Sequence, residues 1–251
     1  MGLIDLKVIV SSKFKAKLFL VLSLTVIFSV LITCYSYVQK ETLDADAQTD
    51  EIPTVIIDAG HGGIDGGTHS YDGTLEKDIN LRIATMLRDI LINLGYTDVV
   101  MTRETDKSIH DDGVQGIRNQ KVSDIKNRLN IIESYENAVF ISIHQNYFTQ
   151  EKYSGAQIFY SKNNPESQKL AQSVRLSLIN EFQKDNTREI KQSGKEIFLL
   201  NNTDSPAIMV ECGFLSNRKE ADLLKTEEYQ RNIAFFVANG LIDYLKSTEE
   251  S

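Results

Sequence analysis

Two histidines and two glutamates in this 251-residue chain stand where side chains could bind a metal ion and activate water. His61 follows the apolar run TVIID in a glycine-rich turn, His144 ends the run AVFISIH, and Glu211 ends the run AIMVE. Glu76 begins a stretch with helical spacing. Two histidines and one carboxylate are typical of a catalytic zinc site, and the second carboxylate could then act as the base. The chain has no H-E-x-x-H motif, so the ligands must come from separate elements.

Each of these residues also has an ordinary structural interpretation when it is taken alone. A glycine-rich turn after a strand often cradles a phosphate or simply reverses the chain. His144 could be a hydrogen-bonded histidine at a strand end, and Glu76 could be an acid favoured by the helix dipole. Glu211 is harder to explain in this way, because a partly buried carboxylate is costly. The combination therefore indicates more than any single member.

The elements that must position these residues follow from the apolar pattern, which alternates between short β-type runs and longer helical ones. Strands are predicted at 54–58, 98–102, 138–144, 156–160, 196–200 and 207–211. Helices are predicted over 76–94, from a cap at Ser123, from Pro165 to Phe182, and from a cap at Thr226 to Leu245. This alternation predicts an α/β domain whose partly parallel central sheet, of about six strands, is covered by helices on both faces. Ligands bind beyond the carboxyl ends of strands in such sheets, which is where His61, His144 and Glu211 fall.

The N-terminal part of the chain has the pattern of a membrane segment. Residues 18–38 carry no charge and are long enough to span a bilayer. Four lysines precede the run and five acids follow it, so the positive-inside rule places the remainder of the chain outside the cytoplasm. We expect an uncleaved anchor; cleavage near Ala45 and Ala47 and lipid attachment at Cys34 are the alternatives.

These observations divide the chain into five parts. We expect a basic cytoplasmic segment at 1–17, a transmembrane anchor or signal segment at 18–38, a polar linker at 39–53, a catalytic domain at 54–247 and a tail at 248–251.

Charge and cysteine content exclude several classes of protein. The formal net charge is -8, and since residues 1–50 carry five bases and five acids, all of it belongs to the remainder of the chain. An acidic domain of this kind is not expected to bind nucleic acid. Two cysteines, Cys34 and Cys212, cannot form a disulfide scaffold or a thiolate metal site.

Several motifs in order resemble one family. They are IIDAGHGGIDGG, LEKDINL, the arginine of KNRLNII, FISIHQN, SGAQIFY and PAIMVECGFLSNRKE. Over residues 54–245 the chain resembles the zinc-dependent N-acetylmuramoyl-L-alanine amidases with a type-3 catalytic domain, whose fold is a twisted, mixed sheet between helices. The resemblance implies peptidoglycan as the substrate, with hydrolysis of the amide between the lactyl group of N-acetylmuramic acid and L-alanine. It also implies that His61, Glu76 and His144 hold Zn²⁺ and that Glu211 is the catalytic carboxylate.

Further residues are expected to support this site. Asp65 and Asn146 could orient the metal ligands. Arg128, on a helix, is expected to anchor Asp58 or a neighbouring carboxylate, with substrate contact as the alternative. Two positions depart from the family pattern, because Gln145 stands where alanine is common and Cys212 where threonine or valine is common. His69 and His110 lie in polar loop contexts and are expected to be bystanders.

The segment 108–126 is longer than in many family members, and with SGAQ and no appended wall-binding module it resembles the germination-specific amidases of the spore cortex. This resemblance implies a role in forming muramic δ-lactam, a downstream muramic-acid deacetylase, an accessory or activator protein and a location outside the membrane, in the intermembrane or cortex space of the developing spore. Three alternatives remain open at this point: a vegetative wall amidase, a peptidoglycan-binding homologue without activity, and a zinc hydrolase acting on other bonds.

Overall fold

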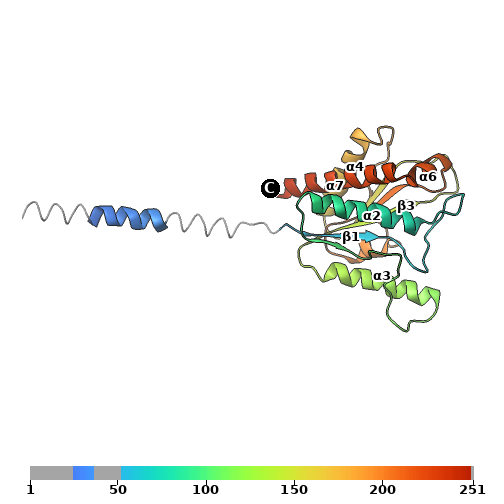
Figure 1. The fold of residues 1–251 in the computed structure, drawn as a ribbon, viewed down its shortest axis with the longest axis horizontal. Helices are drawn as coiled ribbons and strands as arrows, with labels where there is room; N and C mark the ends of the chain where they lie inside the picture. Colours follow the sequence, from blue (N-terminus) through green and yellow to red (C-terminus); the bar gives the residue numbers. More distant parts are fainter. Residues whose placement is uncertain (1–24, 37–51, 250–251) are drawn as a thin grey trace, which may run out of the picture. The chain divides into compact units, whose positions relative to one another are not determined.

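The computed structural model describes residues 25–36 and 52–249, which belong to two units that divide after Asp50. The larger unit, here called the α/β unit, is built around a mixed six-stranded sheet with helices on both faces (Figure 1), as the alternation predicted. The strands are β1 (Thr54–Ala59), β2 (Val99–Met101), β3 (Ala138–Asn146), β4 (Gln157–Tyr160), β5 (Lys191–Gln192) and β6 (Ala207–Phe214). The helices are α2 (Glu76–Asn93), α3 (Ile117–Glu133), α4 (Glu166–Glu181), α5 (Phe198–Asn202), α6 (Arg218–Leu224) and α7 (Glu227–Glu249).

The strand order is β2-β1-β3-β6-β4-β5. Neighbouring strands are parallel except for β4, which runs antiparallel to β6. The carboxyl ends of β1, β3 and β6 therefore lie at one edge of the sheet, together with the amino end of β4. This shared edge is where the polar residues that follow the apolar runs come together.

The two faces of the sheet form separate cores because side chains alternate along each strand. Val55 and Ile57 of β1 pack into the larger core with α2, α4 and α7, while Ile56 packs into the smaller core with α3 and α5. Figure 1 shows α2, α4 and α7 on one side of the sheet and α3 on the other. Burial on both faces explains why β1 and β3 are almost continuously apolar.

Helix boundaries follow local signals at most ends. Gly95, with φ of 95°, donates its N–H to the Ile92 carbonyl and ends α2. Pro165 and Phe182 flank α4 as predicted, and Thr226 accepts a hydrogen bond from the Tyr229 N–H at the start of α7. The last helix continues to Glu249, past residue 247, where the domain was expected to end.

Two element predictions were wrong, and one strand was not predicted. The run at 196–200 is not a strand, because it leads into helix α5, which buries Leu199 and Leu200 against the smaller core; a short apolar run does not by itself distinguish strand from helix. The sixth strand is instead β5, a two-residue polar edge strand with no apolar signal. Ser123 does not cap α3, which begins at Ile117 after Gly116; the Ser123 hydroxyl donates to Asp111.

The described part of the N-terminal unit is a helix at 25–36 with exposed hydrophobic side chains. Within residues 25–36 and 52–249, no helix combines the length and the apolar character needed to cross a membrane. The expected membrane segment at 18–38 lies partly outside the described residues. The segment expected at 1–17 lies wholly outside them, and so does most of the linker expected at 39–53.

Candidate metal centre at the carboxyl edge of the sheet

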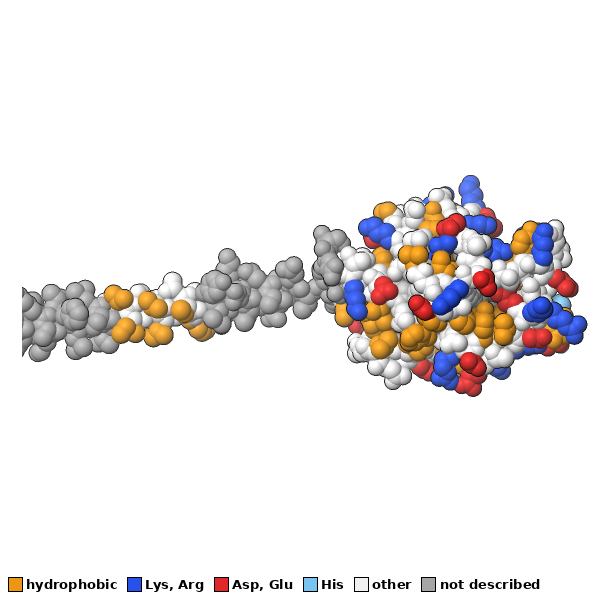
Figure 2. All heavy atoms as spheres, turned by 90° about the horizontal axis from the view of Figure 1, so that it is seen from above, with side chains coloured by type: hydrophobic (Ala, Val, Ile, Leu, Met, Phe, Trp, Pro, Cys, Tyr) orange, Lys and Arg blue, Asp and Glu red, His pale blue; other side chains and the backbone are white. Residues whose placement is uncertain are grey.

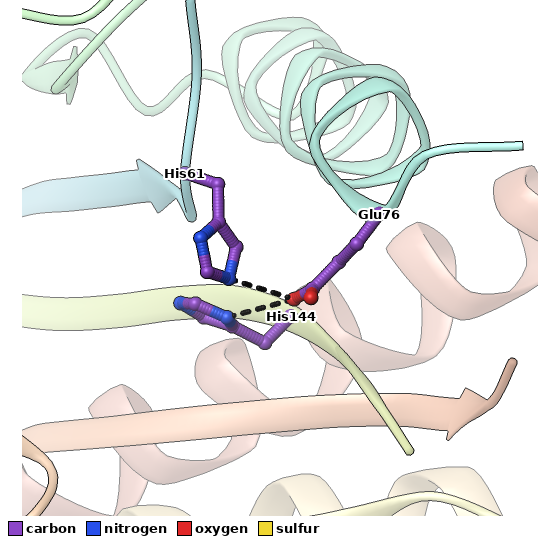
Figure 3. A group of neighbouring side chains, drawn as sticks. All are labelled: His61, Glu76 and His144. Atoms are coloured by element: carbon purple, nitrogen blue, oxygen red, sulfur yellow. Dashed lines mark hydrogen bonds and ion pairs between the residues drawn. The ribbon is translucent and has the colours of Figure 1, made fainter. Parts of the chain in front are cut away.

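Three of the residues singled out in the sequence lie together at this edge. His61 follows β1, Glu76 is the first residue of α2, and His144 lies near the end of β3. Figure 3 shows both imidazole rings turned toward the Glu76 carboxylate. His61 Nε2 lies 3.3 Å and His144 Nδ1 2.9 Å from Glu76 Oε1, and the potential ligand atoms of the three residues are within 4.8 Å of one another.

Glu76 is almost fully buried, and hydrogen bonds hold its carboxylate in place. Its Oε2 accepts the Thr68 N–H at 2.9 Å, and its Oε1 accepts the Gln145 N–H at 3.1 Å and an amide N–H of Asn80 at 3.2 Å. Burial raises the pKa of Glu76, but hydrogen bonds and charge from His144 and His61 outweigh burial and hold that pKa well below its usual range. Glu76 is therefore an anionic oxygen donor with a fixed direction.

His61 is held from both its ring and its backbone. It has φ of 63°, the only positive φ outside glycine among the described residues, and Arg128 Nη2 donates to its carbonyl at 2.6 Å. Asp65 Oδ2 lies 2.9 Å from His61 Nδ1, which leaves Nε2 directed at Glu76. Burial lowers the pKa of His61, but Asp65 and Glu76 outweigh burial and raise it to about 9, so the site favours positive charge.

Two glycines allow these side chains to approach the chain closely. A Cβ at Gly60 would lie 2.2 Å from His144 Nε2, so the imidazole occupies the space that any other residue would fill. Gly67 has φ of 68°, and a Cβ there would lie 2.5 Å from Glu76 Oε2. Gly60 and Gly67 are thus required because a larger residue at either position would collide with a side chain of the cluster.

Glu211 lies beside the cluster on β6, in register with His144 of β3. Its Oε2 is buried and accepts no hydrogen bond from any described residue. Burial is the largest influence on Glu211 and raises its pKa. The charge of Glu76 also raises this pKa, and the charges of His144 and His61 lower it only in part, so that it is about 7. A carboxyl group with this pKa changes protonation state near neutrality, as a general acid–base group must.

Arg128 performs the anchoring role expected from its place on a helix. Its guanidinium lies 2.5 Å from Asp58 Oδ1 and 2.7 Å from Asp124 Oδ2, and it also donates to the carbonyls of Ala59 and His61. Burial raises the pKa of Asp58, but the charges of Arg128 and His144 and the hydrogen bonds from Ser142 and Thr102 together outweigh burial and lower that pKa to about 2. This buried pair attaches α3 to the end of β1 immediately before His61.

The structure also places the remaining candidates. Asp65 contacts His61, as expected of a residue that orients a ligand. Among the described residues, the Asn146 side chain makes no hydrogen bond to the cluster, and its backbone carbonyl accepts the Leu215 N–H. His69 and His110 lie outside the cluster and bond to Ser70 and Ser108, respectively.

Sequence reasoning missed three residues that hold the cluster. Asn80 lies one turn after Glu76 on the buried face of α2, and this polar residue within an apolar stripe was the available signal. Arg103 donates to the carbonyls of Ala59 and Gly60, and Lys121 lies 2.7 Å from Asp65 Oδ1. Lys121 precedes the KNRLNII motif by only five residues, but no local pattern indicates its contact with Asp65 or the contacts of Arg103, so only the fold reveals them.

The residues that depart from the family pattern lie close to the cluster. Gln145 is buried; its backbone N–H donates to Glu76, and its side chain donates to Asn80 at 3.1 Å. Cys212 is a buried free thiol in the larger core. Gln145 thus adds a hydrogen bond behind Glu76, and Cys212 packs as a small apolar residue.

The donor set suits a divalent metal such as zinc. Two imidazole nitrogens and one carboxylate oxygen converge on a small volume, and three protein ligands leave a position for water in a catalytic zinc site. Asp65 behind His61 and Asn80 behind Glu76 are the outer partners that such ligands usually have. The fold and the cluster together define an α/β protein with a possible metal site at the carboxyl edge of its sheet.

Comparison with known proteins identifies the family. Residues 55–243 match the model of the amidase type-3 family, described as N-acetylmuramoyl-L-alanine amidase, so the chain belongs to this family of peptidoglycan-cleaving enzymes. It is 36% identical over 190 residues to the germination-specific N-acetylmuramoyl-L-alanine amidase of Bacillus subtilis, covering 76% of this chain and 78% of the relative.

Two solved structures share the fold and substantial sequence identity. The CwlD amidase from Clostridioides difficile, solved in complex with the GerS lipoprotein, is 41% identical with a TM-score of 0.74, over 78% of this chain and 99% of that one. An N-acetylmuramoyl-L-alanine amidase from Clostridium difficile 630 is 31% identical with a TM-score of 0.66, over 79% of this chain and 99% of that one.

Proposed function

We propose that this enzyme hydrolyses the amide between the lactyl group of N-acetylmuramic acid and L-alanine in peptidoglycan, with zinc as its metal. The observation that carries the proposal is a buried carboxylate with no hydrogen-bond partner on Oε2, Glu211, beside a cluster of two histidines and a glutamate. A binding module has no need for a spare acid–base group at such a site, which argues against a homologue without activity.

His61, Glu76 and His144 would hold the ion. Bound there, zinc would supply Lewis-acid polarisation of the scissile carbonyl and lower the pKa of water. Glu211 takes a proton from the attacking water on its unpartnered Oε2 and returns it to the nitrogen of the departing L-alanine. Asp65 keeps the Nε2 atom of His61 directed into the site by bonding to its Nδ1.

A digestion assay tests this function. The full chain is incubated with purified peptidoglycan with and without a chelator, and the products are separated. We expect new free amino groups on L-alanine and bare muramic acid only without the chelator. Products with new amino groups on any other residue would identify a different hydrolase, and unchanged cleavage with the chelator would exclude the metal.

We further propose that the enzyme acts in spore cortex maturation, upstream of a muramic-acid deacetylase in forming muramic δ-lactam. The germination-specific relative supports this role. The alternative is a vegetative wall amidase. Deletion of the gene should remove muramic δ-lactam from the cortex and leave vegetative growth unchanged; a defect in cell separation with a normal cortex would favour the alternative.

We propose that the chain is anchored by residues 18–38, with its 54–247 domain outside the membrane and 39–53 as the tether. The uncharged run and the exposed hydrophobic side chains of the helix at 25–36 support this arrangement. The full chain should sediment with membranes, whereas a chain without residues 1–38 should not. We also propose an accessory protein, which the lipoprotein in the CwlD complex supports.

A further inference from the structure

A second recess lies at the same edge of the sheet as the metal cluster. This groove, of about 730 Å³, is formed by residues 152–155, by residues 182–188 that follow α4, and by α6. The start of β4 adjoins this groove, because Arg188 of the lining donates to Gln157, which is in register with Glu211 of β6. We call it the basic groove because its lining carries four cationic side chains, those of Lys152, Lys184, Arg188 and Lys219.

The basic groove carries an excess of positive charge, with four cations and two acids in its lining, although the charge of Arg188 is partly offset by that of Glu220. Lys152, Arg188 and Lys219 have no ion pair among the described residues, and only Lys184 has one, with Glu181 at 3.7 Å. Of the two acids in the lining, Asp185 and Glu220, the Glu220 carboxylate is engaged by two backbone N–H groups, of Gly155 and Phe214. A groove with an excess of cations on a chain with net charge -8 favours an anionic ligand.

Arg188 is fixed in place before any ligand arrives. Its guanidinium lies 4.6 Å from the ring centroid of Phe214 and 5.6 Å from that of Tyr153. Nε donates to the Ser154 carbonyl at 3.0 Å and Nη1 to Gln157 Oε1 at 3.3 Å, which leaves Nη2 with no partner among the described residues. A planar, preorganised guanidinium of this kind suits a carboxylate.

The position of the basic groove matches the length of a short peptide. His144, Glu211 and Gln157 lie on three adjacent strands, and neighbouring strands are spaced by about 4.8 Å, so Gln157 lies roughly 10 Å from His144 across the sheet. An extended peptide covers about 3.4 Å per residue. The groove therefore begins about three residues from a bond cleaved at the metal cluster.

The cavity that opens onto the cluster, with His61 and His144 in its lining, extends toward α3 and α5 and differs from the basic groove in charge. It measures about 260 Å³, and its two cations are already paired: Lys121 with Asp65 and Arg128 with Asp58. Glu196 adds a further acid at its lining. An acidic peptide would be repelled there, whereas a neutral glycan would not.

We propose that the basic groove binds the carboxylates of the stem peptide that follows L-alanine in the substrate. The inference rests on the proposed function, since it assigns the acidic product of that cleavage to one side of the cluster and the sugar to the other. Figure 2 shows charges of both signs interspersed over the face of the α/β unit that carries α4 and α7, so the groove is a local feature and not part of a uniformly basic surface.

The test compares two substrates on four proteins: the wild type, a double variant, a control variant and Arg188→Gln. The double variant Lys152→Gln/Lys219→Gln removes two exposed cations without breaking an ion pair, and Lys162→Gln is the matched control, because Lys162 follows the far end of β4. Each full-length protein is assayed on a muramoyl tetrapeptide with free carboxylates and on the same compound with amidated carboxylates. We expect KM of the double variant to rise roughly tenfold on the free acid, with kcat unchanged.

The expected pattern is specific to charge. The rise in KM should disappear on the amidated substrate, the Lys162→Gln control should match the wild type on both, and Arg188→Gln should act in the same direction as the double variant. An equal KM for wild type and double variant on the free acid overturns the groove proposal, and so does an equal rise on both substrates. Wild-type cleavage at the lactyl-alanine bond tests the proposed function separately.

Discussion

At the scale of the residue, the site consists of groups whose properties depend on their neighbours. Glu76 and Glu211 are both buried carboxyl groups near His144, yet the pKa of Glu76 is held low and that of Glu211 is raised to about 7. The difference arises because Glu76 accepts several hydrogen bonds and Glu211 Oε2 accepts none. One carboxylate is thereby suited to hold a cation and the other to move a proton.

Glu211→Gln separates these two roles. The variant should lose amide cleavage by about 10³-fold or more, because glutamine cannot accept the proton from water. It should retain bound metal at one equivalent, since Glu211 is outside the three-residue cluster. Cleavage is measured on muropeptides and metal by elemental analysis; wild-type turnover by this variant would remove Glu211 from the mechanism.

The variants His61→Ala and Gly60→Ala should both lose bound metal, for different reasons. The first removes a ligand, and the second adds a Cβ that would lie 2.2 Å from His144 Nε2 and so displace the ring. Metal content after dialysis is the measurement, with Gly73→Ala as the control, since a Cβ at Gly73 has open space, although its positive φ adds some strain. Full metal content in His61→Ala would exclude that histidine as a ligand.

At the scale of the element, the site is assembled by attachments between helices and strand ends. The Arg128–Asp58 pair joins α3 to β1, and the hydrogen bonds of Glu76 join α2 to the loop at Thr68 and to β3. Each attachment places one member of the cluster. Loss of one attachment should therefore alter the position of a ligand as well as stability.

Asp58→Asn should lower the free energy of unfolding by about 2–3 kcal/mol at pH 7, because it removes one of the two carboxylates that pair with the buried Arg128 guanidinium and leaves only Asp124. The pKa of Asp58 is lowered in the folded protein to about 2 from 3.8, so its ionised form stabilises the fold above pH 4. This contribution is lost as pH falls toward 2. The difference between variant and wild type, measured by urea unfolding, should be constant above pH 4 and shrink below it; a difference independent of pH would contradict this account.

The strands and helices differ in how far the sequence could predict them. Strands β1, β3 and β6 carry long apolar runs, so they and the polar residues at their ends were predictable. The two-residue β5 pairs with β4 through the backbone alone, and α3 begins after Gly116 without a side-chain cap, so neither had a local signal. Lys121 reaches Asp65 only because α3 begins early.

At the scale of the whole molecule, the cluster joins parts of the chain that are distant in sequence. His61, Glu76 and His144 come from the loop after β1, the start of α2 and the end of β3, so they are near one another only in the folded protein. A metal held by all three binds the native state and not the unfolded chain. Metal binding and folding are therefore coupled.

Zinc should accordingly stabilise the full chain against heat. At a free zinc concentration 100 times Kd, the gain is about 2.7 kcal/mol, which for a domain of this size raises Tm by roughly 5–10 °C. The measurement is thermal unfolding of chelator-treated protein with and without added zinc, and His144→Ala is the control because it lacks one ligand while keeping the remainder of the fold. An equal rise in Tm for the wild type and His144→Ala would show that zinc stabilises the protein from another site, and no rise in either would contradict zinc binding at this cluster.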